Sequence, residues 1–291
     1  MEEDYIKAGK IAAEALKYGA GLIKPGASWI EVADKIEKKI IDLGGGIAFP
    51  AQMSLNDVAA HFIPALEETI IFKDEIICLD VGAHVNGAIA DTACTVDLSG
   101  KNSELVKASR EALDEAIKLV KPGVEVRKIG EKIHEVITSY GFSPVRNLCG
   151  HGVGPYQIHT IPSLPNFDNG NTTKLEEGQI IAIEPFASTG AGLIYERGEP
   201  TVFELFNKKP VRSMITRQVL KEIKEFKGLP FTLRWLTKKF GEPKVRFALR
   251  EMRQMKMLRE HPALVDKNHG LVSQAEHTMI VKDKTVITTK L

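Results

Sequence analysis

The chain has 291 residues, of which 43% are hydrophobic and 26% charged, so it can bury a sizeable core in one large domain or two smaller ones. Its apolar stretches fall short of the roughly 18 residues that a membrane-spanning helix needs, and its charged first ten residues exclude a secretory signal peptide. Three cysteines without CxxC spacing favour reduced thiols over a disulfide framework. We therefore predict a soluble, cytoplasmic protein.

The first two predicted elements are amphipathic helices. Ile, Ala and Leu recur at three- and four-residue intervals from about Tyr5 to Ile23, where Lys-Pro-Gly ends the pattern. A second helical pattern follows at once and stops at Gly44. Ser28 precedes Glu31 by three residues, which is the spacing of a capping box at the start of this second helix.

Residues 76–96 have the pattern of a buried β-hairpin, because apolar and β-branched residues flank Asn86-Gly87, a strong type I′ turn signal. That turn places Asp91 opposite Gly82, so Asp80 and Asp91 share one face, about 7 Å apart. Two buried carboxylates repel each other and cannot both ionise without a cation between them. The hairpin alone leaves open a simpler arrangement, with one Asp capping a turn and the other at an exposed sheet edge.

The chain has a weak internal repeat. Lys-Pro-Gly occurs twice, 97 residues apart, and each copy is followed by a helical pattern that ends in glycine, at Gly44 and at Gly141. The apolar run that ends in Asp80 has a counterpart ending in Glu184, at an offset of 104. The repeat unit is too long for a solenoid and occurs too few times. We therefore predict two half-domains related by pseudo-symmetry, with a site between them.

Further polar residues lie in apolar strands or glycine-rich turns of the second half. His151 and His159 belong to the glycine-rich string NLCGHGVGPYQIH, where ligands can approach the backbone closely. Glu184 ends one apolar strand and Glu276 lies in another, where a packed core would not hold a charge. The two aspartates, the two glutamates and one histidine, His151, together predict an oxygen-rich site for two divalent ions.

A basic segment interrupts the second half. Residues 207–260 hold 16 Lys and Arg against 5 Asp and Glu, a net charge of +11, whereas the rest of the chain carries −10. Helical patterns with Pro and Gly breaks fill this stretch, so we expect an inserted helical subdomain at 205–260. For most of these charges we favour a solvated helical face over a small core, and the aromatic residues among them leave a ribosomal RNA contact as a hypothesis.

The whole chain closely resembles the methionine aminopeptidases, and the long insertion before QAEHT resembles their type II branch. The strings LDVGAHVNGAIADTA, GHGVGPY, IEPFAS and QAEHT carry this resemblance. It implies an α+β pita-bread fold, in which two pseudo-symmetric halves surround a dinuclear metal site. The catalytic domain would comprise residues 1–204 and 261–291, and the insertion residues 205–260.

The resemblance also implies a role for each matching residue. Asp80 would bind one metal, His151 and Glu184 the other, and Asp91 and Glu276 both, with Glu184 also moving a proton from the attacking water to the leaving amine. His61 and His159 match the histidines that contact the scissile amide. The residues expected beside the methionine side chain are Phe49, Ile158 and His261, the last of which stands where many type II members have an aromatic residue.

The implied activity is the hydrolytic removal of the initiator methionine from nascent proteins whose second residue is small. The expected cofactors are two divalent ions, Mn²⁺, Fe²⁺, Co²⁺ or Zn²⁺, which such ligands accept nearly alike. We expect a monomer that binds neither DNA nor membrane. Two alternatives remain at this point: an Xaa-Pro aminopeptidase or prolidase, and a non-catalytic pita-bread relative that binds RNA or a partner protein.

Overall fold

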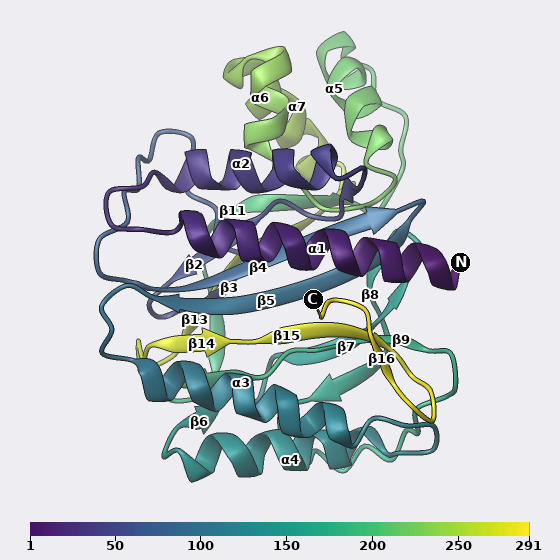
Figure 1. The fold of residues 1–291 in the computed structure, drawn as a ribbon. Coiled ribbons are helices and arrows are strands. Elements are labelled where there is room, and N and C mark those ends of the chain that lie inside the picture. Colours follow the sequence, from purple (N-terminus) through teal and green to yellow (C-terminus); the bar gives the residue numbers. More distant parts are fainter. Residues whose placement is uncertain (291) are drawn as a thin grey trace.

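The computed structural model describes residues 1–290, whose helices and strands are shown in Figure 1. The helices are α1 (Glu2–Leu22), α2 (Trp29–Asp42), α3 (Ser103–Lys118), α4 (Val126–Ser139), α5 (Met214–Glu225), α6 (Leu233–Phe240) and α7 (Glu242–Gln254). The strands are β1 (Gly46–Ile47), β2 (Gln52–Leu55), β3 (Val58–Ala60), β4 (Ile76–Val85), β5 (Ala88–Asp97), β6 (Ser143–Pro144), β7 (Cys149–Gly154), β8 (Gln157–Pro165), β9 (Ile180–Ile183), β10 (Phe186–Ser188), β11 (Ile194–Leu205), β12 (Phe231–Thr232), β13 (Leu258–Asp266), β14 (Val272–Gln274), β15 (Glu276–Ile280) and β16 (Val286–Ile287). None of the helices in this range is long and apolar enough to cross a membrane.

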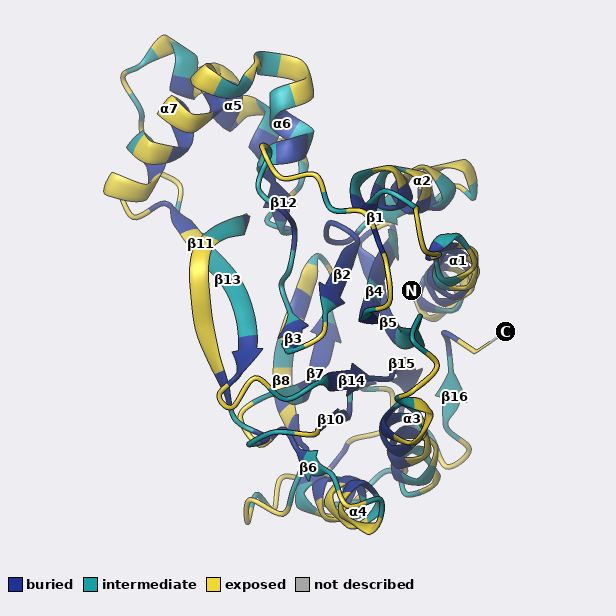
Figure 2. Cartoon of the chain, turned by 90° about the vertical axis from the view of Figure 1, so that its left-hand side faces the viewer, coloured by how far each residue is buried: buried dark blue, intermediate teal, exposed yellow. Residues whose placement is uncertain are grey.

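One large mixed sheet runs through the molecule in the order β1-β4-β5-β15-β9-β7-β8, with β2 added beside β4 and β16 beside β15. Helices α1–α4 lie together on one side of this sheet, while the long strands β11 and β13 curve over the other side (Figure 2). One buried apolar cluster lies under α1 and α2, and a second under α3 and α4. The two halves of the sheet are therefore each covered by a helix pair, as the predicted pseudo-symmetry requires.

The predicted repeat is visible in the backbone. Helix α2 begins at Trp29 and helix α4 at Val126, which are 97 residues apart. Gly44 and Gly141, which follow these helices, adopt positive φ angles of 83° and 80° that favour glycine. The chain thus builds the same helix pair with the same ending twice, and the pita-bread architecture follows from this duplication.

Two local predictions about the first helices need correction. Helix α1 begins at Glu2 rather than near Tyr5. Ser28 is the N-cap residue of α2, but its side chain makes no cap hydrogen bond, so the expected capping box does not form. Instead, the backbone around Ser28 pairs with the segment at 70–72, and the N–H of Trp29 donates to the carbonyl of Ile70 at 2.9 Å.

Helices α5–α7 lie within the basic segment, between the ends of β11 and β13, and project beyond the sheet at the top of Figure 1. They have an apolar cluster of their own, which includes Phe231, Leu236 and Leu249 and extends to Leu205 and Leu258 at the ends of those two strands. We propose that 205–260 be treated as an inserted subdomain on the basis of this separate core.

Candidate metal centre

The hairpin forms with the predicted register. Asn86 and Gly87 have φ angles of 52° and 92°, as a type I′ turn requires, and Gly82 pairs with Asp91. Asp80 and Asp91 therefore point from the same face of the β4–β5 ribbon, and both line one cavity.

The strand order brings the remaining acidic residues to the same place. Glu276 is the first residue of β15, which lies between β5 and β9, and Glu184 directly follows β9. His151 of β7 pairs with Ala182 of β9. The five neighbouring strands β4, β5, β15, β9 and β7 thus contribute Asp80, Asp91, Glu276, Glu184 and His151 in turn.

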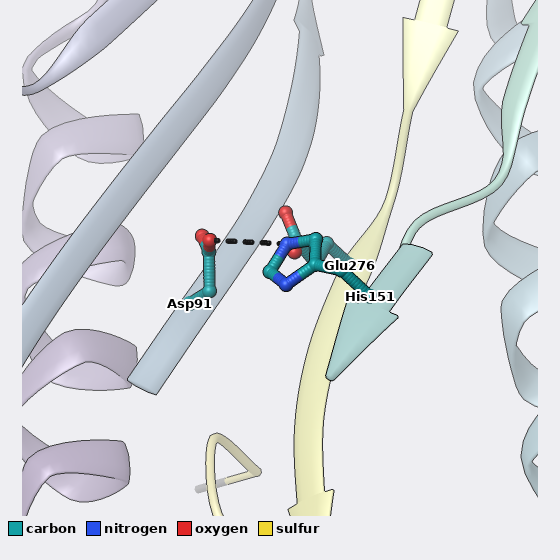
Figure 3. Close-up of side chains that lie close together, drawn as sticks. All are labelled: Asp91, His151 and Glu276. Atoms are coloured by element: carbon teal, nitrogen blue, oxygen red, sulfur yellow. Dashed lines mark ion pairs between the residues drawn. The ribbon is translucent and has the colours of Figure 1, made fainter. Parts of the chain in front are cut away.

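Three of these side chains are close enough to share one ion. Ligand atoms of Asp91, His151 and Glu276 all lie within 4.8 Å of one another, and Nε2 of His151 is 3.7 Å from Oδ2 of Asp91 (Figure 3). Nδ1 of His151 donates to the carbonyl oxygen of Gly152 at 3.1 Å. This bond leaves the lone pair of Nε2 directed at the carboxylates, as a metal-binding histidine requires.

Burial raises the pKa of every carboxyl group in the cluster. Neighbouring acids raise it further for Asp91, Glu184 and Glu276, whereas for Asp80 a hydrogen bond with Asp91 opposes part of the rise. The pKa of Asp80 rises to about 7, and those of Asp91, Glu184 and Glu276 rise well above their usual range. For the imidazole the effect has the opposite sign, since burial lowers the pKa of His151 to about 3. The histidine is therefore neutral at pH 7, in the form that binds a metal.

The donor set fits a divalent cation. Oδ1 of Asp80, Oδ1 of Asp91 and Oε1 of Glu276 are buried oxygens with no hydrogen-bond partner among the described residues. Such unpaired buried oxygens are costly unless a cation satisfies them. Carboxylate oxygens with one imidazole suit divalent transition metals.

One cavity of about 250 Å³ contains every residue that the sequence predicted for the site. Those residues are Phe49, His61, Asp80, Asp91, His151, Ile158, His159, Glu184, His261 and Glu276. The walls away from the carboxylates are largely apolar, because Phe49, Ile158, Val202 and Pro230 contribute to them. A cavity of this kind suits a flexible apolar side chain next to a polar reacting centre.

Three imidazoles line the cavity near the carboxylates. The ring of His61 packs edge-on against that of His261, with centroids 5.3 Å apart, and His159 packs against His151 at 4.5 Å. Burial, with the neighbouring imidazoles, lowers the pKa of His61 to about 3 and also lowers the pKa of His159. Each neutral imidazole in this position can donate one hydrogen bond to a substrate and accept one from it.

A family model described as Metallopeptidase family M24 matches residues 3–226. The chain belongs to the M24 metallopeptidases. It is similar over its whole length to a relative named methionine aminopeptidase from Archaeoglobus fulgidus, with 46% identity over 100% of this chain and 99% of the relative. Methionine aminopeptidase 2 of Komagataella phaffii is 34% identical over 96% of this chain and 67% of its own length. Within M24 the chain thus belongs to the methionine aminopeptidases.

Solved structures share the fold. The methionine aminopeptidase from Thermotoga maritima is 25% identical, with a TM-score of 0.73 over 99% of this chain and 96% of that chain. The prolidase from Pyrococcus furiosus is 19% identical, with a TM-score of 0.64 over 99% of this chain but 63% of that chain. The α+β pita-bread fold expected from the sequence is thereby confirmed.

Sequence reasoning gave no role to three polar residues that support the M24 site. Nε2 of Gln274 lies 3.4 Å from Oε2 of Glu184 and 3.3 Å from Oε2 of Glu276. Gln52 accepts the backbone N–H of His61 at 2.8 Å, which holds His61 at a positive φ of 61°. Glu204 lies 3.6 Å from Nε2 of His261. Gln274 stands inside the QAEHT motif of the resemblance, but it has no charge to mark it.

Proposed function

We propose that this chain is a metal-dependent aminopeptidase that removes methionine from the N-termini of polypeptides. The observation that carries this proposal is the set of two buried and two half-buried carboxyl groups and one neutral histidine at one end of a small cavity with apolar walls. Carboxyl groups so placed have no stable ionised state without cations, and the apolar end suits a thioether. The membership of the methionine aminopeptidases supports the same activity.

We assign Asp80 to one divalent ion, His151 and Glu184 to a second, and Asp91 and Glu276 to both. The five strands that supply these residues are neighbours in the sheet, which supports a shared centre. Bound metal ions would lower the pKa of a coordinated water and polarise the scissile carbonyl. Mn²⁺, Fe²⁺, Co²⁺ and Zn²⁺ all suit these ligands.

The residues of the chain have separate tasks in the proposed reaction. Glu184, whose pKa is raised by burial and then by Asp91 and Asp80, takes a proton from the attacking water and passes it to the leaving amine. His61 and His159 contact the scissile amide as neutral imidazoles. Phe49, Ile158 and His261 enclose the methionine side chain and exclude water from it.

The proposed substrates are nascent polypeptides with a small second residue. We place the enzyme in the cytoplasm, as a monomer that binds neither DNA nor membrane. An Xaa-Pro aminopeptidase or prolidase shares the fold, but the relatives with high identity over the whole chain carry the name methionine aminopeptidase. A non-catalytic binding protein would have no use for unpaired buried carboxylates in a cavity.

The activity is tested by comparing release of methionine from Met-Ala-Ser with cleavage of Ala-Pro-Ser, using chelator-treated protein resupplied with Mn²⁺ or Co²⁺. We expect metal-dependent cleavage of the first peptide alone. Cleavage of Ala-Pro-Ser would support the Xaa-Pro enzyme instead. A fully metallated protein that cleaves neither peptide would support a non-catalytic relative.

We also propose that the inserted helices contact ribosomal RNA. Lys238, Lys239 and Arg246 are already paired with Asp34, Glu222 and Glu67 on the protein itself. Exposed Arg217, Lys221 and Lys224 follow one face of α5 and form no ion pair with the described residues, so they are the better candidates for phosphate contacts.

The test of this contact is ribosome co-sedimentation at increasing salt. Replacing the three α5 residues by Glu should weaken binding and reduce its salt dependence, whereas Lys239→Glu should have a smaller effect. Co-sedimentation that the triple replacement leaves unchanged would reject the contact.

A further inference from the structure

Glu37 of α2 connects the inserted helices to the wall of the catalytic cavity. It is an acidic residue with a relative exposure of only 6%, far from the carboxylates of the metal centre in the sequence, and none of the roles proposed above involves it. Both of its carboxylate oxygens are occupied. Oε1 accepts the backbone N–H of Ala51 at 3.2 Å and also a guanidinium N–H of Arg234, while Oε2 accepts the indole N–H of Trp235 at 2.9 Å.

One partner of Glu37 belongs to the segment that forms one wall of the cavity. Ala51 is buried between Phe49 and Gln52, and both of these neighbours line the cavity. Gln52 in turn pairs with Asp80 in the sheet and accepts the N–H of His61. The position of Ala51 therefore fixes the cavity wall that contains Phe49, and through Gln52 it also fixes the backbone of His61 beside the metal centre.

The other two partners belong to the insertion, which forms another wall. Arg234 and Trp235 lie at the start of α6, four and five residues after Pro230, which lines the same cavity. The intervening β12 is fixed to β11, because Thr232 pairs with Val202, another cavity residue. Arg234 is 6% exposed and also pairs with Asp34, so its charge is buried in this contact.

We propose that Glu37 and Arg234 are positioning residues that set the width of the methionine pocket. This inference rests on the proposed aminopeptidase function. A single carboxylate oxygen holds both the Ala51 backbone and the Arg234 guanidinium, so the 49–52 segment and the Pro230 segment cannot move apart without breaking a buried, charge-assisted hydrogen bond. Loss of Arg234 leaves the buried Glu37 carboxylate without a cation, which is the costly outcome for such a pair.

Two variants test the contact and a third provides a matched control. Glu37→Gln keeps the shape of the side chain but presents an amide N–H₂ to partners that are all donors. Arg234→Met removes the guanidinium and keeps much of its apolar length. Lys238→Met removes the neighbouring ion pair between α6 and α2, in which exposed Lys238 donates to Asp34 at 2.8 Å.

We expect Glu37→Gln and Arg234→Met to raise the KM for Met-Ala-Ser about tenfold, equivalent to about 1.4 kcal/mol, with kcat changed less than about twofold. The preference for Met-Ala-Ser over Leu-Ala-Ser should shrink, since a wider pocket discriminates less. Metal content should stay at the wild-type value, and Lys238→Met should match wild type throughout. A merely structural role would lower the active fraction and hence kcat, without changing KM or the Met/Leu ratio.

Wild-type kinetics separate the failure of this inference from that of the function. An active wild type whose KM and Met/Leu preference are unchanged by Glu37→Gln would overturn the positioning role alone. A wild type that releases no methionine with any of the four metals would overturn the proposed function and this inference with it. Should Arg234→Met fail to fold, the nearly isosteric Glu37→Gln still decides the question.

Discussion

At the scale of single residues, burial is the largest cause that raises the pKa of the four carboxyl groups in the cavity, and neighbouring acids raise it further for Asp91, Glu184 and Glu276. The choice of Asp80 and Asp91 could be predicted from the sequence, since the Asn-Gly turn fixes the register of the hairpin that carries them. The roles of Gln52, Glu204 and Gln274 could not, because neutral or surface-type side chains become informative only when their neighbours are known.

We predict that Asp91→Asn abolishes metal binding and lowers kcat/KM at least about a thousandfold while the fold survives. In the absence of metal this variant should be at least as stable as wild type, because it removes a repelling acid from a buried cluster. Metal analysis, peptide assays and thermal unfolding measure these effects. Wild-type metal content and activity in the variant would exclude a metal role for Asp91.

Gly82 provides a second test at this scale. A Cβ atom at this position would lie 2.1 Å from the ring of Phe49, so the glycine makes room for a pocket wall. We expect Gly82→Ala to destabilise the protein by about 1–3 kcal/mol and to raise the KM for methionine peptides. Gly21→Ala is the matched control, because no atom of residues 1–290 lies within 4 Å of a Cβ placed there, and alanine favours the helix. Equal effects of the two substitutions would contradict this role of Gly82.

At the scale of elements, local sequence signals predicted the helices and the hairpin but not every contact that ends them. The repeat predicted α2 and α4 because glycines after each helix must adopt positive φ. The prediction of a capping box at Ser28 was wrong, because the start of this helix pairs with residues 70–72, a segment distant in the sequence. The placement of β15 between β5 and β9 was likewise not predictable from spacing, since that pairing joins residues more than 90 positions apart.

Two serines at helix N-termini should respond differently to the same substitution. The side chain of Ser213 accepts the N–H of Thr216 at the start of α5, whereas Ser28 makes no such bond at α2. We expect Ser213→Ala to destabilise the helix by about 1 kcal/mol, and Ser28→Ala by less than half of that. Chemical denaturation of both variants provides the comparison, and a larger loss for Ser28→Ala would show that the assigned caps are incorrect.

At the scale of the whole molecule, two similar halves meet at a site that neither half could form alone. Asp80 and Asp91 come from the first half, and His151 and Glu184 from the second. The apolar cluster behind each half holds the strands in place. The site residues between the two clusters are charged or polar and contribute little to apolar packing. This arrangement links the stability of the protein to metal and pH.

The raised carboxyl pKa values determine the sign of that link. A carboxyl group with a raised pKa holds its proton in the folded state at a pH where the unfolded chain has lost it, so its contribution to stability is lost as pH rises. For Asp80 the window runs from its ordinary value of 3.8 to about 7. The unfolding temperature of metal-free protein should fall across this window relative to that of Asp80→Asn, and the gain from added Mn²⁺ should grow with pH. Calorimetry with chelator and with Mn²⁺ checks both trends, and a metal-induced gain that shrinks with rising pH would contradict them.

The most direct test of the proposed site is the release of methionine from Met-Ala-Ser by metal-free protein during titration with Mn²⁺ at pH 7.5. We expect no release before metal is added, and activity that rises with bound Mn²⁺ to a plateau by two ions per chain. Full methionine release by the metal-free protein in excess chelator would contradict the assignment of this buried carboxylate cluster as the reacting centre.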